Sequence, residues 1–460
     1  MSSPPPRRRL RVLLAAIVVL AVLAGGAVAF VLAHKPGDVS HPDVEFTGST
    51  QQTAPPRPQA VDRFLWPTYG FGADRTRDYA DAPGYLRPGF RRGWTYRSGA
   101  LAEFPPTIDG GSIYFLDDDG ILRAIDKVSG AIRWRQHVGD LAAASPAVGD
   151  GRVYAVALRG LGSASGRVAA YRASDGRQVW SKALPSRAES SPLLRNGRVF
   201  FGSEDGTVYA LSARNGRTIW TYRASGAVKG GPALSNGTLY FGDYGGKVHA
   251  VSARSGREVW SVGTSGTRFG FGSGSFYSTP AVAFGRVYLG NTDGRVYSFA
   301  ASSGKLAWAT STGAYVYASA AVGDTPGLGP TVYIGSYDGN FYAFDARSGG
   351  VRWKYPAGAK ISGSATIVGG LVYFSNLGAR NTVGLSARTG RKLWFFPNGG
   401  FNPVVADRRA IYLAGYTDIF ELLPKRASRS WREAQAATVR AVRQTERPAA
   451  PARRRRRGGT

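Results

Sequence analysis

Apolar residues alternate with polar ones, or gather in short runs, from about residue 106 to residue 422, and turn residues separate the runs. This pattern predicts many short β-strands. Asp-Gly pairs at 119–120, 205–206, 293–294 and 338–339 suit tight hairpins, because glycine adopts a positive φ without steric cost. Eight stretches are expected to form strand pairs: 113–125, 153–171, 199–211, 239–251, 287–299, 332–344, 372–385 and 411–422.

A tryptophan recurs along these stretches at intervals of 40 to 48 residues, at Trp94, Trp134, Trp180, Trp220, Trp260, Trp308, Trp353 and Trp394. A period of about forty residues is the length of a four-stranded propeller blade. Trp94 precedes every strand pair, and the last pair has no tryptophan strand after it. We therefore expect Trp94 to supply the outer strand of the blade formed by 401–422. The sequence predicts an all-β, eight-bladed β-propeller of four-stranded antiparallel sheets, closed by pairing its first strand with its last.

The N-terminus carries a membrane signal. Residues 1–11 are basic, and the 22 uncharged residues 12–33 are enough to span a bilayer as a transmembrane signal-anchor helix. Basic residues before the span and a large domain after it predict a single-pass protein of the cell membrane, with its propeller outside the cytoplasm. A cleavable signal peptide is the alternative, since 27–29 fits a small-residue cleavage pattern, but the apolar run is longer than signal peptides need.

Three further regions follow from composition. Residues 34–60 are rich in Pro, Gly, Ser and Thr and predict a flexible linker, and 61–424 hold the propeller. In 425–460, Ser430 and Glu433 have the spacing of a capping box, and helix-forming residues continue to Arg447. We expect a basic helix followed by a disordered tail. An apolar stripe suited to docking this helix on the propeller consists of Trp431, Ala434, Val439 and Val442.

The net charge of +29 argues for anionic neighbours, such as membrane headgroups or anionic envelope polymers, or simply for a solvated basic surface. Nucleic acid is not expected outside the cytoplasm. The chain has no cysteine, which excludes disulfides, thiolate catalysis and lipid attachment through cysteine. Its four histidines are far apart in sequence and show no metal-ligand spacing.

The repeat endings carry a resemblance. The stretches 124–134 and 343–353 fit the pattern Ala-x-Asp-x-x-x-Gly-x-x-x-Trp, which resembles the docking motif of the pyrroloquinoline-quinone (PQQ) repeat propellers. The stretch 66–70, followed by 75–77, is similar to the entry segment before the first blade of that superfamily. The resemblance implies that the eight tryptophans pack between adjacent blades, a structural task.

Two branches of this superfamily matter. Quinoprotein dehydrogenases oxidise alcohols or sugars with PQQ and calcium, whereas BamB-like propellers are non-catalytic interaction scaffolds. Acidic residues are sparse here, and 117–120 predicts a hairpin turn because it lacks the ligand spacing of a calcium loop. We expect no cofactor, no metal and no enzymatic activity, but a membrane-anchored scaffold that binds a protein or an envelope polymer. The alternatives are a PQQ/calcium-dependent dehydrogenase and a small-ligand sensor.

Two features suggest where a partner binds. One repeat position lies three residues before each inner strand, near the channel axis, and it varies in chemistry: Glu103, Ala143, Glu189, Lys229, Tyr277, Tyr317, Ser362 and Gly400. The longest insertion, 261–277, offers an aromatic and basic patch made of Arg268, Phe269, Phe271, Phe276 and Tyr277. The glycine-rich stretch 159–166 predicts a long hairpin turn and not a phosphate loop.

Overall fold

The computed structural model describes residues 16–23, 26, 37–48, 64–264, 274–401, 404–426 and 428–445. The chain divides into two compact units, 1–39 and 40–460. Residues 16–23 of the first unit are helical. Within the described ranges, no helix has the length and apolar character needed to cross a membrane. Much of the expected anchor, at 12–15, 24–25 and 27–33, lies outside those ranges, so the anchor stays a prediction.

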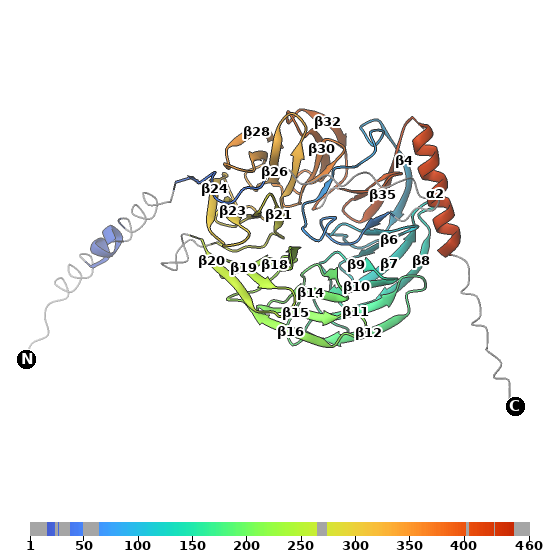
Figure 1. Ribbon diagram of the computed structural model, residues 1–460, viewed down its shortest axis with the longest axis horizontal. Helices are drawn as coiled ribbons and strands as arrows, with labels where there is room; N and C mark the ends of the chain where they lie inside the picture. Colours follow the sequence, from blue (N-terminus) through green and yellow to red (C-terminus); the bar gives the residue numbers. More distant parts are fainter. Residues whose placement is uncertain are drawn as a thin grey trace, which may run out of the picture. The chain divides into compact units, whose positions relative to one another are not determined.

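The described parts of residues 64–424 form eight sheets arranged in a ring, each built on four antiparallel strands, as Figure 1 shows. The prediction of an eight-bladed propeller is confirmed. The ring closes because β4 (Phe90–Arg97) pairs with β35 (Asp418–Pro424), so that the first long strand becomes the outer strand of the last blade. This closure leaves the sheet order β33-β34-β35-β4 in blade 8.

The blades are numbered in chain order, each from its inner to its outer strand. Blade 1 contains β5 (Thr107–Asp109), β6 (Ser112–Leu116), β7 (Ile121–Asp126) and β8 (Ile132–His137). Blade 2 contains β9 (Ala147–Gly149), β10 (Arg152–Ala157), β11 (Arg167–Arg172) and β12 (Gln178–Ala183). Blade 3 contains β13 (Leu193–Arg195), β14 (Arg198–Gly202), β15 (Thr207–Ser212) and β16 (Thr218–Arg223). Blade 4 contains β17 (Ala233–Ser235), β18 (Thr238–Gly242), β19 (Lys247–Ser252) and β20 (Glu258–Gly263).

The second half of the ring repeats this order. Blade 5 contains β21 (Ala281–Ala283), β22 (Arg286–Gly290), β23 (Arg295–Ala300) and β24 (Leu306–Ser311). Blade 6 contains β25 (Ala321–Thr325), β26 (Gly329–Gly335), β27 (Asn340–Asp345) and β28 (Val351–Pro356). Blade 7 contains β29 (Thr366–Val368), β30 (Leu371–Asn376), β31 (Asn381–Ser386) and β32 (Lys392–Phe396). Blade 8 contains β33 (Val404–Ala406), β34 (Ile411–Ala414), β35 and β4. Three short strands join sheets at their edges: β1 (Val39–Ser40), β2 (Leu65–Trp66) and β3 (Asp78–Tyr79).

Seven of the recurring tryptophans contact the next blade in the same way. The Trp180 indole N–H donates to the Ala213 carbonyl at 3.0 Å, and a Cβ added to Gly216 would lie 2.6 Å from the Trp180 ring. Only glycine therefore fits under the ring. The same pairing of an indole N–H with the carbonyl of the next blade occurs at Trp94, Trp134, Trp220, Trp260, Trp308 and Trp353. Trp394 instead meets Phe90 of β4, with ring centroids 5.8 Å apart.

The entry segment, residues 64–79, crosses the central channel. Its backbone carbonyls at Pro67, Ala73, Asp74, Thr76 and Arg77 accept hydrogen bonds from inner-strand N–H groups of blades 2, 4, 5, 6 and 7. Arg75 is fully buried and donates to the Pro232 and Ser191 carbonyls, each at 3.0 Å, and burial lowers its pKa to about 9. The Arg77 guanidinium lies 4.5 Å from the Tyr69 ring centroid. One continuous segment thus ties the inner edges of the blades together.

Helix α2 (Arg429–Thr445) lies along blades 8 and 1 (Figure 1). Its packed face follows helical spacing: Trp431 contacts the core of these blades, and Thr438, Ala441 and Val442 are buried. The expected helix is therefore present, but its cap is Ser428, whose hydroxyl accepts the Trp431 N–H at 3.1 Å. The Ser430 cap was wrong because the chain enters the helix two residues earlier.

Buried ions connect blades 1 and 8 beneath this helix. Lys127 Nζ lies 2.7 Å from Asp407 Oδ2, and both side chains are fully buried. Arg409 pairs with Glu421 and also donates to the Lys127 carbonyl at 3.1 Å. The Gln435 side chain of α2 accepts a hydrogen bond from Arg409. This cluster joins the two ends of the ring at the closing interface.

Part of the predicted linker packs on the propeller. Phe46 stacks on Phe284 with ring centroids 5.6 Å apart, and Arg286 Nε donates to the Val44 carbonyl at 2.9 Å. Thr47 N–H donates to the Phe284 carbonyl at 3.1 Å. Residues 40–47 therefore contact blades 5 and 6, whereas 49–60 lie outside the described ranges.

Candidate functional site

The inner strands begin around one mouth of the channel, where a small cavity of about 40 Å³ lies. The repeat position three residues before each inner strand contributes much of its lining: Glu103, Lys229, Tyr277, Tyr317 and Ser362. Tyr69 of the entry segment also lines it, and its hydroxyl lies 2.5 Å from Ser364 Oγ. Five of the eight residues at this repeat position thus face one shared space, together with Tyr69 of the entry segment.

Charged side chains occupy one side of the mouth. Lys229 Nζ lies 2.6 Å from Glu189 Oε1 and 2.7 Å from Glu204 Oε1. Burial would lower the pKa of Lys229, but its hydrogen bonds to these two carboxylates outweigh burial and raise that pKa. Burial raises the pKa of Glu189 despite the same contact. Burial, with repulsion from Asp118 and Glu189, raises the pKa of Glu103 to about 7.

Tyrosines occupy the adjacent side. We call Tyr244, Tyr277, Tyr315, Tyr317 and Tyr337 the tyrosine rim. They come from the β18–β19 turn, the loops before β21 and β25, and the β26–β27 turn. The ring centroids lie 6.3 Å apart for Tyr244 and Tyr277, and 5.7 Å apart for Tyr277 and Tyr317. The Tyr317 ring also contacts the rings of Tyr315 and Tyr337, at centroid distances of 5.9 and 4.9 Å. Tyr315 is 54% exposed. The rim is a continuous aromatic surface over blades 4 to 6.

Cations flank these rings. Lys229 Nζ lies 5.4 Å from the Tyr244 centroid, and Lys360 Nζ lies 5.6 Å from the Tyr337 centroid. At these distances an ammonium is attracted to the face of an aromatic ring. The rim therefore combines apolar ring faces, phenolic hydroxyls and positive charge on a rigid support. Tyrosine with these neighbours is typical of protein recognition surfaces.

The candidate residues of the long insertion divide into three groups. Tyr277 lies on the rim, whereas Arg268, Phe269 and Phe271 lie outside the described ranges. Phe276 is fully buried in the core between blades 4 and 5, so it does not belong to an exposed patch. Its ring packs where glycine at 242 leaves room, since a Cβ there would lie 2.3 Å from the Phe276 Cβ.

Three rim residues were missed by the sequence reasoning: Tyr244, Tyr315 and Tyr337. Tyr244 and Tyr337 hold the same place in the turn between the two middle strands of their blades, the place that Asp118 and Glu204 hold in blades 1 and 3. Aligning these turns would have given a second ring of variable residues at the mouth. Asp117 of the 117–120 turn is buried and pairs with Arg123.

The described residues of this mouth offer no evident ligand set for PQQ with calcium. Over the described ranges, no group of three or more His, Cys, Asp or Glu side chains is placed to hold a metal ion.

Comparison with known proteins identifies a family that matches this chain. Residues 90–164, 118–325 and 225–433 match the family described as outer membrane protein assembly factor BamB. No curated protein sequence matches the chain significantly.

Solved structures share the architecture. BamB from Moraxella catarrhalis is 18% identical, with a TM-score of 0.59 over 73% of this chain and 99% of that one. The quinohemoprotein alcohol dehydrogenase ADHIIG from Pseudomonas putida HK5 is 15% identical, with a TM-score of 0.65 over 79% of this chain and 80% of that one. A europium-containing methanol dehydrogenase is 14% identical, with a TM-score of 0.64 over 84% of this chain and 96% of that one.

At these identities the structural similarity shows the fold alone, and it is shared by BamB and by dehydrogenases. The family matches together run from residue 90 to residue 433. The chain therefore belongs to the PQQ-like repeat propeller family described as outer membrane protein assembly factor BamB.

Proposed function

We propose that this protein is a non-catalytic scaffold of the cell envelope that binds a protein partner at the tyrosine rim. In this proposal residues 12–33 anchor it in the cell membrane and the propeller lies outside the cytoplasm. The observation that carries the proposal is the rim itself, five tyrosines joined by four ring contacts, with lysine ammonium groups over two of the rings.

Rigid aromatic side chains give much contact area for little loss of conformational entropy, since a tyrosine has only two side-chain torsions. Their neighbours at the mouth are already ordered by ion pairs, as Lys229 is by Glu189 and Glu204. A partner that covers this surface therefore meets a preorganised site, which favours affinity. Membership of the BamB-described family supports protein binding over catalysis. The PQQ/calcium dehydrogenase alternative is not adopted, because the described residues include no group of three or more His, Cys, Asp or Glu placed to hold a metal ion.

Affinity purification tests this proposal. The tagged full-length chain is recovered from detergent-solubilised membranes of the source cells, beside a rim variant carrying Tyr315→Ser, Tyr317→Ser and Tyr337→Ser. The matched control carries Val179→Ser, Ile219→Ser and Val259→Ser, three apolar side chains that are 42%, 44% and 54% exposed on outer strands.

We expect a partner that co-purifies with the wild type and the control but not with the rim variant. Thermal melting of all three proteins verifies that each is folded. Recovery of the same partners with the rim variant would contradict the assignment of the binding surface.

A further inference from the structure

An arginine clamp repeats at the end of the ring opposite the mouth, where the inner strands end. Arg198 Nη1 donates to the Ala253 and Arg254 carbonyls of the next blade at 2.8 and 2.7 Å. Arg286 makes the same contacts with the Ala346 and Arg347 carbonyls at 3.4 and 2.5 Å. The grooves between blades 3 and 4 and between blades 5 and 6 thus share this clamp, and each is bordered by the exposed side chain of an arginine in the next blade.

The groove between blades 5 and 6 holds a turn of this chain, residues 42–45, in which the Val44 N–H donates to the His41 carbonyl at 3.1 Å. Arg286 Nε donates to the Val44 and Glu45 carbonyls at 2.9 and 3.1 Å, and its Nη2 donates to the Pro42 carbonyl at 3.1 Å. Asp43 Oδ1 lies 3.1 Å from Arg347 Nη2. Peptide carbonyls therefore meet the clamp, and an acidic side chain meets the neighbouring arginine.

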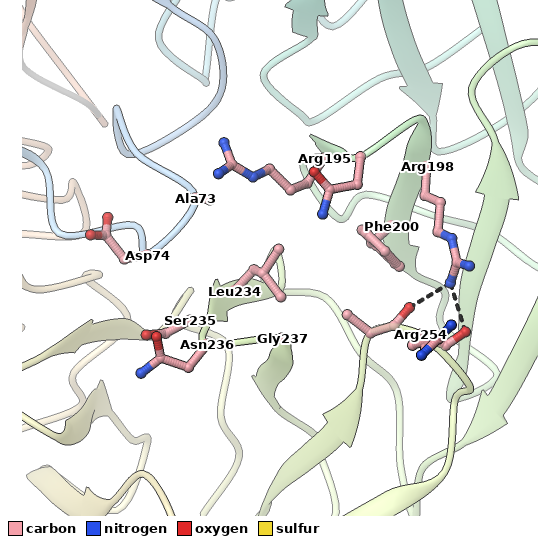
Figure 2. Close-up of a pocket in the computed structure, with 12 residues that line it drawn as sticks. Ala73, Asp74, Arg195, Arg198, Phe200, Leu234, Ser235, Asn236, Gly237 and Arg254 are labelled. Atoms are coloured by element: carbon pink, nitrogen blue, oxygen red, sulfur yellow. Dashed lines mark hydrogen bonds between the residues drawn. The ribbon is translucent and has the colours of Figure 1, made fainter.

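The groove between blades 3 and 4 contains a cavity of about 800 Å³, shown in Figure 2. Arg195, Arg198 and Arg254 line it, and Ala73 and Leu234 supply apolar surface. Arg198 uses Nη1 as Arg286 does, but no residue in the described part of the chain accepts from its Nε or Nη2. The donors that bind residues 42–45 in the other groove are therefore available here.

One carboxylate also lines this groove. Asp74 Oδ1 accepts hydrogen bonds from the Thr76 N–H and hydroxyl, so it is engaged with its own loop. Figure 2 shows Asp74 on the far side of the pocket from Arg254. With three arginines and one aspartate in its lining, the groove favours an anionic ligand.

The groove between blades 2 and 3 has the same clamp but different surroundings. Arg152 donates to the Ala213 and Arg214 carbonyls at 2.8 and 2.9 Å. Gly149 and Asp150 stand there in place of Arg195 and Asn196, which removes one positive charge and adds a negative one. A Leu194 methyl lies 2.8 Å from where a Gly149 Cβ would be, so leucine fills space beside that glycine. This groove serves as an internal control.

We propose that the groove between blades 3 and 4 binds an acidic peptide turn of a partner protein, as the groove between blades 5 and 6 binds residues 42–47 of this chain. Peptide carbonyls accept from Arg198, an acidic side chain pairs with Arg254, and an apolar side chain packs on Leu234 and Ala73. This site is separate from the tyrosine rim and does not depend on the function proposed for it.

The test uses the purified full-length chain and a fluorescein-labelled peptide with the sequence of residues 41–47, His-Pro-Asp-Val-Glu-Phe-Thr. Fluorescence anisotropy is expected to show saturable binding. Arg254→Glu and Arg195→Glu should each weaken it at least about fivefold, because attraction becomes repulsion at a surface pair. The matched Arg214→Glu, the same charge change in the control groove, should alter affinity less than about twofold. A peptide with Asn and Gln in place of its two acids should bind weakly.

Three results would overturn the proposal. The first is no saturable binding up to about 1 mM peptide. The second is an equal loss with Arg254→Glu and Arg214→Glu, which would indicate general electrostatic attraction. The third is binding that neither Arg254→Glu nor Arg195→Glu weakens, which would place the peptide elsewhere. Because none of these variants touches the tyrosine rim, failure here leaves the rim proposal standing.

Discussion

The buried Lys127–Asp407 pair gives a quantitative test of how the ring is closed. Lys127→Met removes the cation and keeps an unbranched apolar side chain of similar length. Asp407 is then left as a fully buried carboxylate without its 2.7 Å partner. Breaking a buried pair from one side costs about 3–5 kcal/mol.

The size of the domain converts this cost into a melting temperature. Unfolding entropy is about 2.1 cal/mol/K per residue, so a domain of about 360 residues has about 0.75 kcal/mol/K. A loss of 3–5 kcal/mol then lowers Tm by about 4–7 °C. Differential scanning calorimetry of the full chain measures this shift.

A second substitution isolates the cause. Asp407 Oδ1 accepts the N–H groups of Arg409 and Ala410, each at 2.8 Å, and an asparagine oxygen can accept both. Lys127→Met combined with Asp407→Asn removes the unpaired charge and keeps this acceptor, so it should recover more than half of the lost Tm. A single variant that melts within about 1 °C of the wild type, or a double variant no more stable than the single one, would refute the reasoning.

Two further predictions concern protonation and packing. Burial raises the pKa of Glu103 to about 7, so the folded state binds the Glu103 proton more tightly than the unfolded state does. The stability gained from this tighter proton binding is present below the unfolded-state pKa and is lost as pH rises through about 7. Tm should therefore fall from pH 5 to pH 7.5 more steeply for the wild type than for Glu103→Gln, and identical slopes would contradict the assignment. Gly216 and Gly197 have φ values of 73° and 69°, but only at Gly216 would a Cβ meet the Trp180 ring. Gly216→Ala should cost about 1–3 kcal/mol more than Gly197→Ala in denaturant unfolding, and equal costs would mean that the tryptophan contact contributes nothing.

The repeat pattern was enough to predict the ring because every blade repeats the same local sequence pattern. Strand alternation, Asp-Gly turns and the Gly-to-Trp spacing all act within about forty residues, and Trp94 was left over as the closing strand. The repeat position holding Glu103, Lys229 and Tyr277 was likewise predicted to face the channel, since equivalent positions in a closed ring share one location.

Contacts between distant segments had no such signal. The Pro- and Gly-rich composition of 34–60 predicts a linker, yet Arg286 binds the backbone carbonyls of Pro42 and Val44, which every residue type possesses. Lys127 and Asp407 are far apart in sequence and meet only because the ring closes. Tyr315 reaches the mouth from a position outside the aligned inner strands, so only the folded loop shows its contact with Tyr317.

Site-specific photo-crosslinking in native membranes tests the central claim, that the tyrosine rim is the partner-binding surface. A benzophenone amino acid is placed at Tyr315 or Tyr337 of the rim, and at Ile219, which is 44% exposed on an outer strand, as the control. A discrete crosslinked product is expected from positions 315 and 337 and not from position 219. No product from the rim positions, or the same product from position 219, would contradict it.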